Sequence, residues 1–474
     1  VGGAAVNVGT QTSGTQSATH YLRAVKTNTS TQACESALTG TAPVNFAYEC
    51  NNPATCSGSN LMTVTGSSSA TIPRYNAGSV GVGSAVNLAF DANGNAPFTF
   101  NFLDVGRVTL HASKDPGGTL LTKLSGNTNA YVTKPAQFLL SGIKQTAAPQ
   151  LANPAAANAS AAKFVKAGEA FSMTLTVVGS GGLATPNFGR ESTPEFVRLI
   201  PTLVLPTGGN AGTLSNDLVG SPYGSTFVNG SVTVTNLSWS EVGVMSLTPL
   251  IGDVRYIGTS TVTGPSTGNI GRFYPHHFDT AVTQACTSGA FTYSGQPQTV
   301  QATAKNAANG TTTNYDGSGA AGVNFARAVT WSDGNSVAGT VSPATLAATA
   351  FRLGVASGTP AFTFTTARTS PSVIRLRATD TDTASSASGT EGTANIRSGR
   401  LYVQNAYGSE LLDLPMVAQA QYWNGSGYVL NAVDNCTSLA VPASGSGMVS
   451  TPAALATKAL ATLNGTATGS VPML

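Results

Sequence analysis

Two aspartates in Thr379-Asp-Thr-Asp-Thr383 have the chemistry and the spacing to bind a metal ion. Asp380 and Asp382 alternate along an extended segment, so both carboxylates lie on one face. Ca²⁺ takes several oxygen ligands of this kind. We expect no cofactor in this protein unless Asp380 and Asp382 bind Ca²⁺, and the simpler alternative is that the two aspartates form a turn.

The adjacent histidines His276 and His277 are a second metal candidate. Successive residues of a strand point to opposite faces, so one strand does not easily direct both rings at one ion. The alternative that we favour is structural. In that interpretation Phe273, Tyr274 and Phe278 pack at a boundary between modules, with the histidines at its rim.

Tyr422 and Trp423 are the candidate ligand-binding residues. Their rings could stack on sugars, because an aromatic side chain combines a large apolar face with a polar edge. The alternative is that they are core aromatics of a β-sandwich.

The sequence contains no assembled catalytic motif. It has no Gly-x-Ser-x-Gly followed by a helix, and its four histidines are scattered. Glu191 and Glu195 lie in a polar loop, which is little support for the paired carboxylates of a glycosidase. We therefore predict that the protein is not an enzyme.

The five cysteines indicate disulfides formed in an oxidising compartment. Three of them lie close together near the start, without a Cys-x-x-Cys motif or an intervening histidine, which disfavours a zinc site. Cys50 can pair with Cys56 or with Cys34, and a pair of Cys286 with Cys436 would tie a third module to the C-terminal segment. An odd count leaves one thiol over. The disulfide candidates are Cys34, Cys50, Cys56, Cys286 and Cys436.

The composition favours an exported protein rich in strands. Charged residues make up only 9% of 474 residues and the net charge is +3, so no basic field for nucleic acid is expected. Thr, Val and Phe are plentiful, whereas the helix formers Glu, Lys and Gln are scarce. No run of 18 apolar residues occurs, so we expect no membrane-spanning segment. We predict a bacterial protein that is secreted or held on the cell surface.

A repeated pattern predicts tandem modules. Gly168 and Gly295 each precede an alternating strand, and Asn187 and Asn314 each follow it; both pairs are 127 positions apart. A long fixed period of this size indicates repeated domains. Acid-Val-Gly turns at 104–106 and 241–243 each lead into another alternating strand, as in many immunoglobulin-like sandwiches. The predicted fold is all-β, with tandem immunoglobulin-like antiparallel β-sandwich modules.

The same landmarks divide the chain. We predict a β-rich module that contains Cys34, Cys50 and Cys56, a linker rich in Ala, Pro and Asn, two immunoglobulin-like sandwiches, and a C-terminal β-rich segment that we expect to be incomplete. The boundaries are 1–144, 145–162 for the linker, 163–271, 272–397 and 398–474.

Several long peptides resemble one known family, the Q-type biogenesis protein of the mannose-sensitive haemagglutinin (MSHA) type IV pilus, in its C-terminal region. The resemblance covers nearly the whole chain and implies a large secreted protein encoded with type IV pilus genes, at the cell surface or the pilus tip. It transfers no catalytic residues. The peptides that carry it are Val44 to Pro53, Arg272 to Phe278, Phe291 to Pro297, Asn405 to Pro415, Gln421 to Gly425 and Asp434 to Thr437.

Together these observations predict a non-enzymatic structural or adhesive protein of a type IV, MSHA-like pilus or cell-surface assembly. A multi-module stalk would present the binding surface, and loops on a stable sandwich suit that role. One alternative is a lectin-like module that binds glycans near Trp423. Another is a filament subunit that polymerises by strand exchange at an open sheet edge. The expected partners are pilus or other surface proteins and host or surface glycans.

Overall fold

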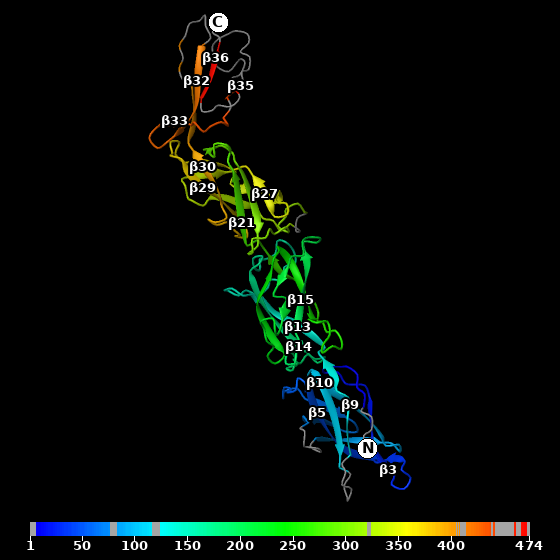
Figure 1. Cartoon of the computed structure of the whole chain (residues 1–474). Coiled ribbons are helices and arrows are strands. Elements are labelled where there is room, and N and C mark those ends of the chain that lie inside the picture. Colours follow the sequence, from blue (N-terminus) through cyan, green and yellow to red (C-terminus); the bar gives the residue numbers. More distant parts are fainter. Residues whose placement is uncertain are drawn as a thin grey trace.

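The computed structural model describes residues 6–75, 83–115, 124–319, 324–403, 405, 407, 414–437, 439–440, 459–460 and 466–471. Four β modules follow one another along an elongated rod, from the N-terminal module at one end to the C-terminal module at the other (Figure 1). The regular elements of these described residues are strands, apart from one short 3-10 turn. The predicted all-β class is therefore confirmed. No helix in the described part of the chain is long and apolar enough to cross a membrane.

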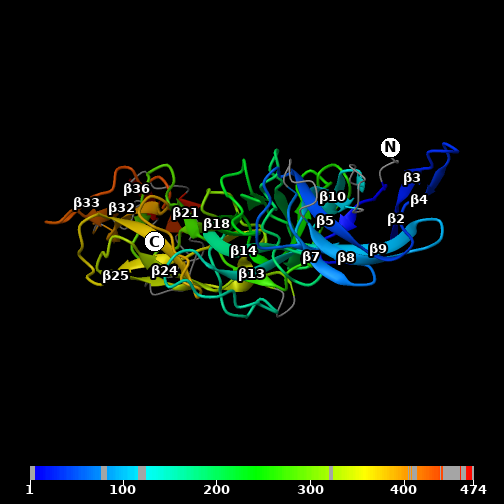
Figure 2. The same cartoon turned by 90° about the horizontal axis from the view of Figure 1, so that it is seen from below.

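The first module packs two sheets around one core. One sheet has the order β1-β12-β10-β5-β8 with β11 beside β10, and the other has the order β2-β9-β6-β7. The hairpin of β3 and β4 lies apart from both sheets at the N-terminal end of the rod (Figure 2). The strands are β1 (Gln11–Thr12), β2 (His20–Arg23), β3 (Val25–Thr27), β4 (Cys34–Ser36), β5 (Gly40–Asn52), β6 (Met62–Thr65), β7 (Ser69–Ile72), β8 (Ser84–Phe90), β9 (Asn95–Phe102), β10 (Gly106–Lys114), β11 (Leu124–Asn127) and β12 (Tyr131–Lys134).

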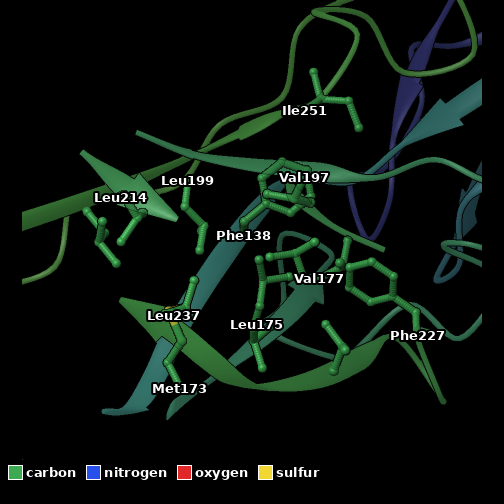
Figure 3. Packing of buried hydrophobic residues seen from close by; sticks show 14 of the residues in the cluster. Phe138, Met173, Leu175, Val177, Val197, Leu199, Leu214, Phe227, Leu237 and Ile251 are labelled. Carbon is green, nitrogen blue, oxygen red and sulfur yellow. The ribbon is translucent and has the colours of Figure 1, made fainter. Parts of the chain in front are cut away.

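The second module is a sandwich of two four-stranded sheets, β13-β14-β18-β16 and β17-β15-β19-β20. Apolar side chains from both sheets point toward one another between the layers (Figure 3). The strands are β13 (Gln137–Gln145), β14 (Ala170–Val178), β15 (Val197–Leu205), β16 (Leu214–Ser215), β17 (Leu218–Val219), β18 (Ser231–Trp239), β19 (Gly243–Ile251) and β20 (Ile270–Phe273).

Strand β14 shows why the alternating pattern predicts this layer. Phe171, Met173, Leu175 and Val177 are fully buried in the core. Between them, the hydroxyl of Thr174 contacts a neighbouring strand instead. A strand with one apolar and one polar face has to cover the apolar face, and the opposing sheet does so.

The third module repeats the arrangement, with sheets β21-β23-β27 and β22-β30-β29-β24-β26 and the separate pair β25-β28. Val300, Ala302 and Ala304 on β23 are buried, so the strand 127 positions after β14 is also a core strand. The elements are β21 (His277–Thr283), β22 (Thr292–Tyr293), β23 (Thr299–Lys305), β24 (Val329–Asp333), β25 (Gly339–Ser342), β26 (Thr345–Leu346), η1 (Ala348–Ala350), β27 (Val355–Gly358), β28 (Ala361–Phe364), β29 (Ser372–Asp380) and β30 (Gly392–Arg397).

The fourth module contains a sheet in which β32 pairs with β31 on one side and with β33 and β36 on the other. Most of the peptide 405–415, which contributes to the family resemblance, lies outside the described residues. The strands are β31 (Gly399–Val403), β32 (Leu414–Trp423), β33 (Tyr428–Leu430), β34 (Leu439–Ala440), β35 (Ala459–Leu460) and β36 (Thr466–Val471).

Two predicted boundaries are wrong. Strand β13 pairs along its length with β14, so residues 137–145 belong to the second module and not to the first. The predicted linker at 145–162 is docked on the second module. The Asn153 side chain donates to the Asn269 carbonyl and accepts from the Gly271 amide, and the Ala156 amide donates to the Gly271 carbonyl. This segment connects β13 to β14 within one module, and its side-chain hydrogen bonds explain why a composition typical of linkers is ordered.

Candidate functional site

The two acid-Val-Gly turns form the joints between modules. At the first joint, Asp104 accepts hydrogen bonds from the amides of Val105 and Asn187 (2.9 and 3.0 Å). The Asn187 side chain donates to the Val105 carbonyl at 3.1 Å and accepts from the Ser57 amide. Val105 is fully buried within the core of the second module. A residue of the first module thus completes the core of the next one.

The second joint has the same construction. Glu241 accepts from the amides of Val242 and Asn314 (2.8 and 3.2 Å), and Asn314 donates to the Val242 carbonyl at 2.9 Å. The Asn314 side chain also accepts from the Asn210 amide, as Asn187 accepts from Ser57. Val242 is fully buried in the core of the third module.

Further backbone contacts repeat at the two joints. The Ser180 amide donates to the Ser13 carbonyl at 2.8 Å, and the Ala307 amide donates to the Ala167 carbonyl at 2.9 Å. Ser180 and Ala307 are 127 positions apart, like the two asparagines. The 127-residue repeat in the sequence therefore includes the residues with which the second and third modules bind the module before them.

Glycine is required in both turns. Gly106 has a φ of 132° and Gly243 a φ of 133°, a region that L residues rarely adopt. A Cβ on Gly106 would lie 2.6 Å from the Asn52 carbonyl oxygen. The acid, the valine and the glycine each have a separate function at the joint: hydrogen-bond acceptor, core residue and sharp turn.

Buried carboxyl groups gather beside the first joint. Burial raises the pKa of Asp104 to about 7, against the effect of its two amide donors, and one of its oxygens has no hydrogen-bond partner among the described residues. Burial likewise raises the pKa of Glu195 to about 7 and that of Glu191 above its usual range. Glu191 accepts from the Tyr256 hydroxyl at 2.9 Å and Glu195 from the Ile257 amide at 2.7 Å. These two glutamates therefore brace a loop from inside the protein and do not face a cleft.

The third joint is built differently. Ser370-Pro371-Ser372 leads into β29, so the acid-Val-Gly sequence is missing. A disulfide of Cys286 with Cys436 joins the third and fourth modules instead. Tyr293 donates to Asp434 at 2.8 Å and accepts from Asn431.

The disulfide predictions can now be resolved. Of the two alternatives for Cys50, the bond to Cys56 is formed. The pair of Cys286 with Cys436 is confirmed. Cys34 keeps a free, exposed thiol in the hairpin at the N-terminal end of the rod.

Both predicted calcium ligands have protein partners in the structure. Asp382 accepts both Nη1 and Nη2 of Arg272, at 2.6 and 2.7 Å, and lies 3.3 Å from Nε of Arg327. Although burial acts to raise it, the hydrogen bonds and positive charge of Arg272 hold the pKa of Asp382 below its usual value. Asp380 accepts from the Tyr315 hydroxyl and from two backbone amides. Asp382 thus serves the second joint, since Arg272 belongs to β20 of the preceding module, whereas Asp380 binds groups of its own module.

The prediction that the two histidine rings point to opposite faces is wrong. His276 lies in a bend before β21, and its Nδ1 is 2.9 Å from Nδ1 of His277. Their other nitrogens lie 3.8 Å from Glu169 and 3.5 Å from Asp279 respectively. Among the described residues no group of three or more potential ligands could hold a metal ion. Phe273 and Phe278 pack into the cores of the second and third modules, as a boundary peptide requires.

Tyr422 and Trp423 lie on opposite faces of β32. Tyr422 stacks with Arg397 of the third module, with 4.7 Å between the guanidinium carbon and the ring centre. Trp423 packs against Tyr428, at 5.3 Å between ring centres, and near Arg368. The structure therefore separates the two predicted ligand-binding residues.

The geometry defines an all-β protein whose successive sandwiches are joined into a rod by repeated acid–asparagine contacts. The chain belongs to the DUF6701 family, a family of unknown function whose four consecutive domain models match nearly all of it. They match residues 2–126 (described as the first Ig-like domain), 134–235 (second domain), 241–399 (third domain) and 397–472 (fourth domain). No curated protein matches the sequence.

Similar solved structures include three from bacterial adhesion proteins. The Escherichia coli adhesin FdeC is 11% identical, with 84% of this chain and 99% of that chain covered and a TM-score of 0.26. The bacterial integrin-binding protein invasin is 11% identical, with 80% and 78% covered and a TM-score of 0.27. A tetra-tandem repeat from the extending region of a large adhesion protein is 13% identical, with 88% and 81% covered and a TM-score of 0.29. TM-scores this low mean that the whole chains do not superimpose. The immunoglobulin-like assignment therefore rests on the paired sheets of each sandwich and on the first family model.

Proposed function

We propose that this chain is a non-enzymatic stalk of a bacterial surface assembly, of the MSHA-like type IV pilus kind, that holds a binding surface away from the cell. The observation that carries the proposal is the joint that occurs twice. At each joint a valine enters the core of the following module and a buried acid binds its asparagine. Interfaces that share a core restrict relative domain motion, whereas polar contacts between domains usually permit it.

The disulfides support a location outside the cytosol. Two of them are present, one inside the first module and one between the third and fourth modules. Disulfides persist in oxidising compartments and are rare where thiols are kept reduced. Charged residues make up only 9% of the chain, which is the composition expected above for an exported protein.

The free thiol of Cys34 provides a test of location. A membrane-impermeant maleimide should label intact cells that express the protein, and a Cys34→Ser variant should stay unlabelled. Labelling that occurs only after lysis would contradict display on the surface. The comparison of strains with and without pili tests the pilus assignment.

Electron microscopy of the purified chain tests the stalk itself. Straight particles with four beads in line are expected. A variant with Ala at both Asn187 and Asn314 should give bent particles while each module keeps its fold, because it loses the side-chain hydrogen bonds of both joints. Freely bent particles from the parent protein would refute a rigid stalk.

A further inference from the structure

The fourth module has one sheet face that is crowded with aromatic and amide side chains. In antiparallel pairs, directly opposed residues lie on the same face. Arg400 is opposite Gln421, Tyr402 is opposite Gln419, and Trp423 is opposite Tyr428. We call this set of six residues the outer face of the fourth module. Tyr422 lies on the other face, toward the third module.

Arginine and aromatic side chains form one row of contacts across the outer face. The Arg400 guanidinium lies 3.9 Å from the centre of the Tyr428 ring and 5.3 Å from that of Tyr402. Tyr428 contacts the Trp423 ring edge to face, and Arg368 of the third module lies 5.5 Å from the centre of the Trp423 ring. The row thus runs from the third module onto the fourth, in the order Arg368, Trp423, Tyr428, Arg400 and Tyr402.

Hydrogen bonds hold the centre of the face in place. Arg400 donates to the Gln421 oxygen from Nε and Nη2, at 2.9 and 2.7 Å. Gln421 in turn donates to the Gln419 oxygen at 2.8 Å. Stacking and hydrogen bonding together fix a guanidinium that is otherwise flexible, which lowers the entropy cost of binding.

The chemistry of the face selects an anionic, hydroxyl-rich ligand. The six residues and Arg368 include two positive charges and no carboxylate. Aromatic rings, of which Tyr402 is 40% exposed, offer apolar surface to the C–H groups of a pyranose ring. Gln421 is buried and holds Arg400 in place, so Gln419 is the amide that can match a hydroxyl. Arginine side chains match carboxylate or sulfate.

We propose that the outer face of the fourth module binds an acidic saccharide, with Arg400 and Arg368 on its anionic groups and Trp423 and Tyr402 against its rings. This inference rests on the proposed display outside the cell, where such polymers are encountered. It names the ligand class of the binding surface that the stalk holds outward.

Calorimetry on the full purified chain tests the proposal with three probes. These are an oligogalacturonate, a sulfated heparin-derived oligosaccharide and a neutral malto-oligosaccharide of equal length. At least one acidic probe should bind and weaken with added salt, while the neutral probe should bind much less. The two acidic probes distinguish carboxylate from sulfate as the anionic group.

Variants connect the binding to the face. Trp423→Ala and Arg400→Gln should each weaken binding about tenfold, since a lost stacking or charge contact of about 1.4 kcal/mol has that effect. Arg400→Lys keeps the charge and loses the planar stacking, so it should also bind more weakly. Arg198→Gln, at an exposed position of β15 in the second module, is the matched control and should bind like the parent. A thermal melt establishes that each variant keeps its fold.

Several outcomes would overturn the inference. They are equal binding of the neutral probe, no binding of either acidic probe, and unchanged affinity in Trp423→Ala and Arg400→Gln. Labelling of Cys34 on intact cells without any saccharide binding would reject this ligand class and leave the stalk in place. Binding by the purified chain with labelling only after lysis would reject the surface stalk instead.

Discussion

The substitution Asp104→Asn should stabilise the first joint at alkaline pH. Asp104 is buried in a turn whose valine enters the second core, and burial raises its pKa to about 7. The folded state therefore binds a proton that a solvated aspartate would already have lost. The contribution of the Asp104 side chain to the free energy of unfolding is fully present below the usual aspartate pKa of about 4, and it declines as the pH rises to about 7. Asparagine keeps the shape and an oxygen acceptor and removes the charge.

The size of the effect follows from the pKa. A pKa of about 7 in place of about 4 corresponds to roughly 4 kcal/mol as an upper bound, at about 1.4 kcal/mol for each tenfold change. That pKa already includes the two amide hydrogen bonds, which oppose the effect of burial. The gain is smaller than the bound because the asparagine side chain places a buried N–H donor where the aspartate oxygen has no hydrogen-bond partner among the described residues. We expect the variant to be more stable than the parent by about 1–3 kcal/mol at about pH 8.5, and nearly equal at about pH 4.

Differential scanning calorimetry of the full chain across this pH range measures the difference. A gain of this size should raise the melting temperature of the module by roughly 5 °C at alkaline pH. Charged and titratable neighbours contribute in both proteins. Burial raises the pKa of Glu191 and Glu195, while Arg190 acts in the opposite direction on Asp104. Some loss of stability with rising pH should therefore persist in the variant.

Asp91→Asn is the matched control. Hydrogen bonds, first from the Asn95 amide, lower the pKa of Asp91, so its charged form is the one favoured in the folded turn. Its amide variant should not be stabilised at alkaline pH. Equal pH dependence in the parent and Asp104→Asn, or destabilisation of Asp104→Asn at about pH 8.5, would show that the burial cost does not dominate.

Four further substitutions probe the other joints. Val242→Ala removes apolar atoms from the core of the third module, and Asn314→Ala removes the side-chain hydrogen bonds of the second joint. Each variant should lower the free energy of unfolding by about 1–3 kcal/mol and broaden the distribution of particle dimensions in small-angle X-ray scattering. Cys286→Ser should leave the melting of the first two modules unchanged and make the fourth module the first to be released in limited proteolysis, and simultaneous loss of all modules would argue against this. Arg272→Gln should lower the free energy of unfolding by about 2–4 kcal/mol, because Asp382 loses its bidentate partner and keeps only Arg327 at 3.3 Å, and an unchanged melting curve would contradict that role.

The sequence predicted the core strands well because alternation is a local signal. Phe171 and Met173 on β14 and Val300 on β23 are all fully buried, as their spacing indicates. The period of 127 likewise predicted two modules of one kind. Turn glycines were visible too, but the acid-Val-Gly turns were interpreted only as entries to strands.

The joints could not be predicted because their contacts join residues far apart in the chain. Asp104 meets Asn187 across 83 positions, and nothing local to either residue indicates the other. The burial of Glu191 was missed for the same reason, since the Tyr256 hydroxyl that binds it lies 65 positions away. The one available signal in the sequence was that two acid-Val-Gly turns, at 104–106 and 241–243, are each followed by one repeated asparagine, Asn187 and Asn314.

The segment after β13 changes how the rod would respond to a pull on its ends. It runs beside β20 as that strand leaves the second module: the Phe164 and Ala167 amides donate to the carbonyls of Arg272 and Tyr274. Tension on the connection between the two modules is therefore shared with a neighbouring stretch of backbone. The bonds between them would have to fail together in shear, and not singly from one end, before the covalent connection extended.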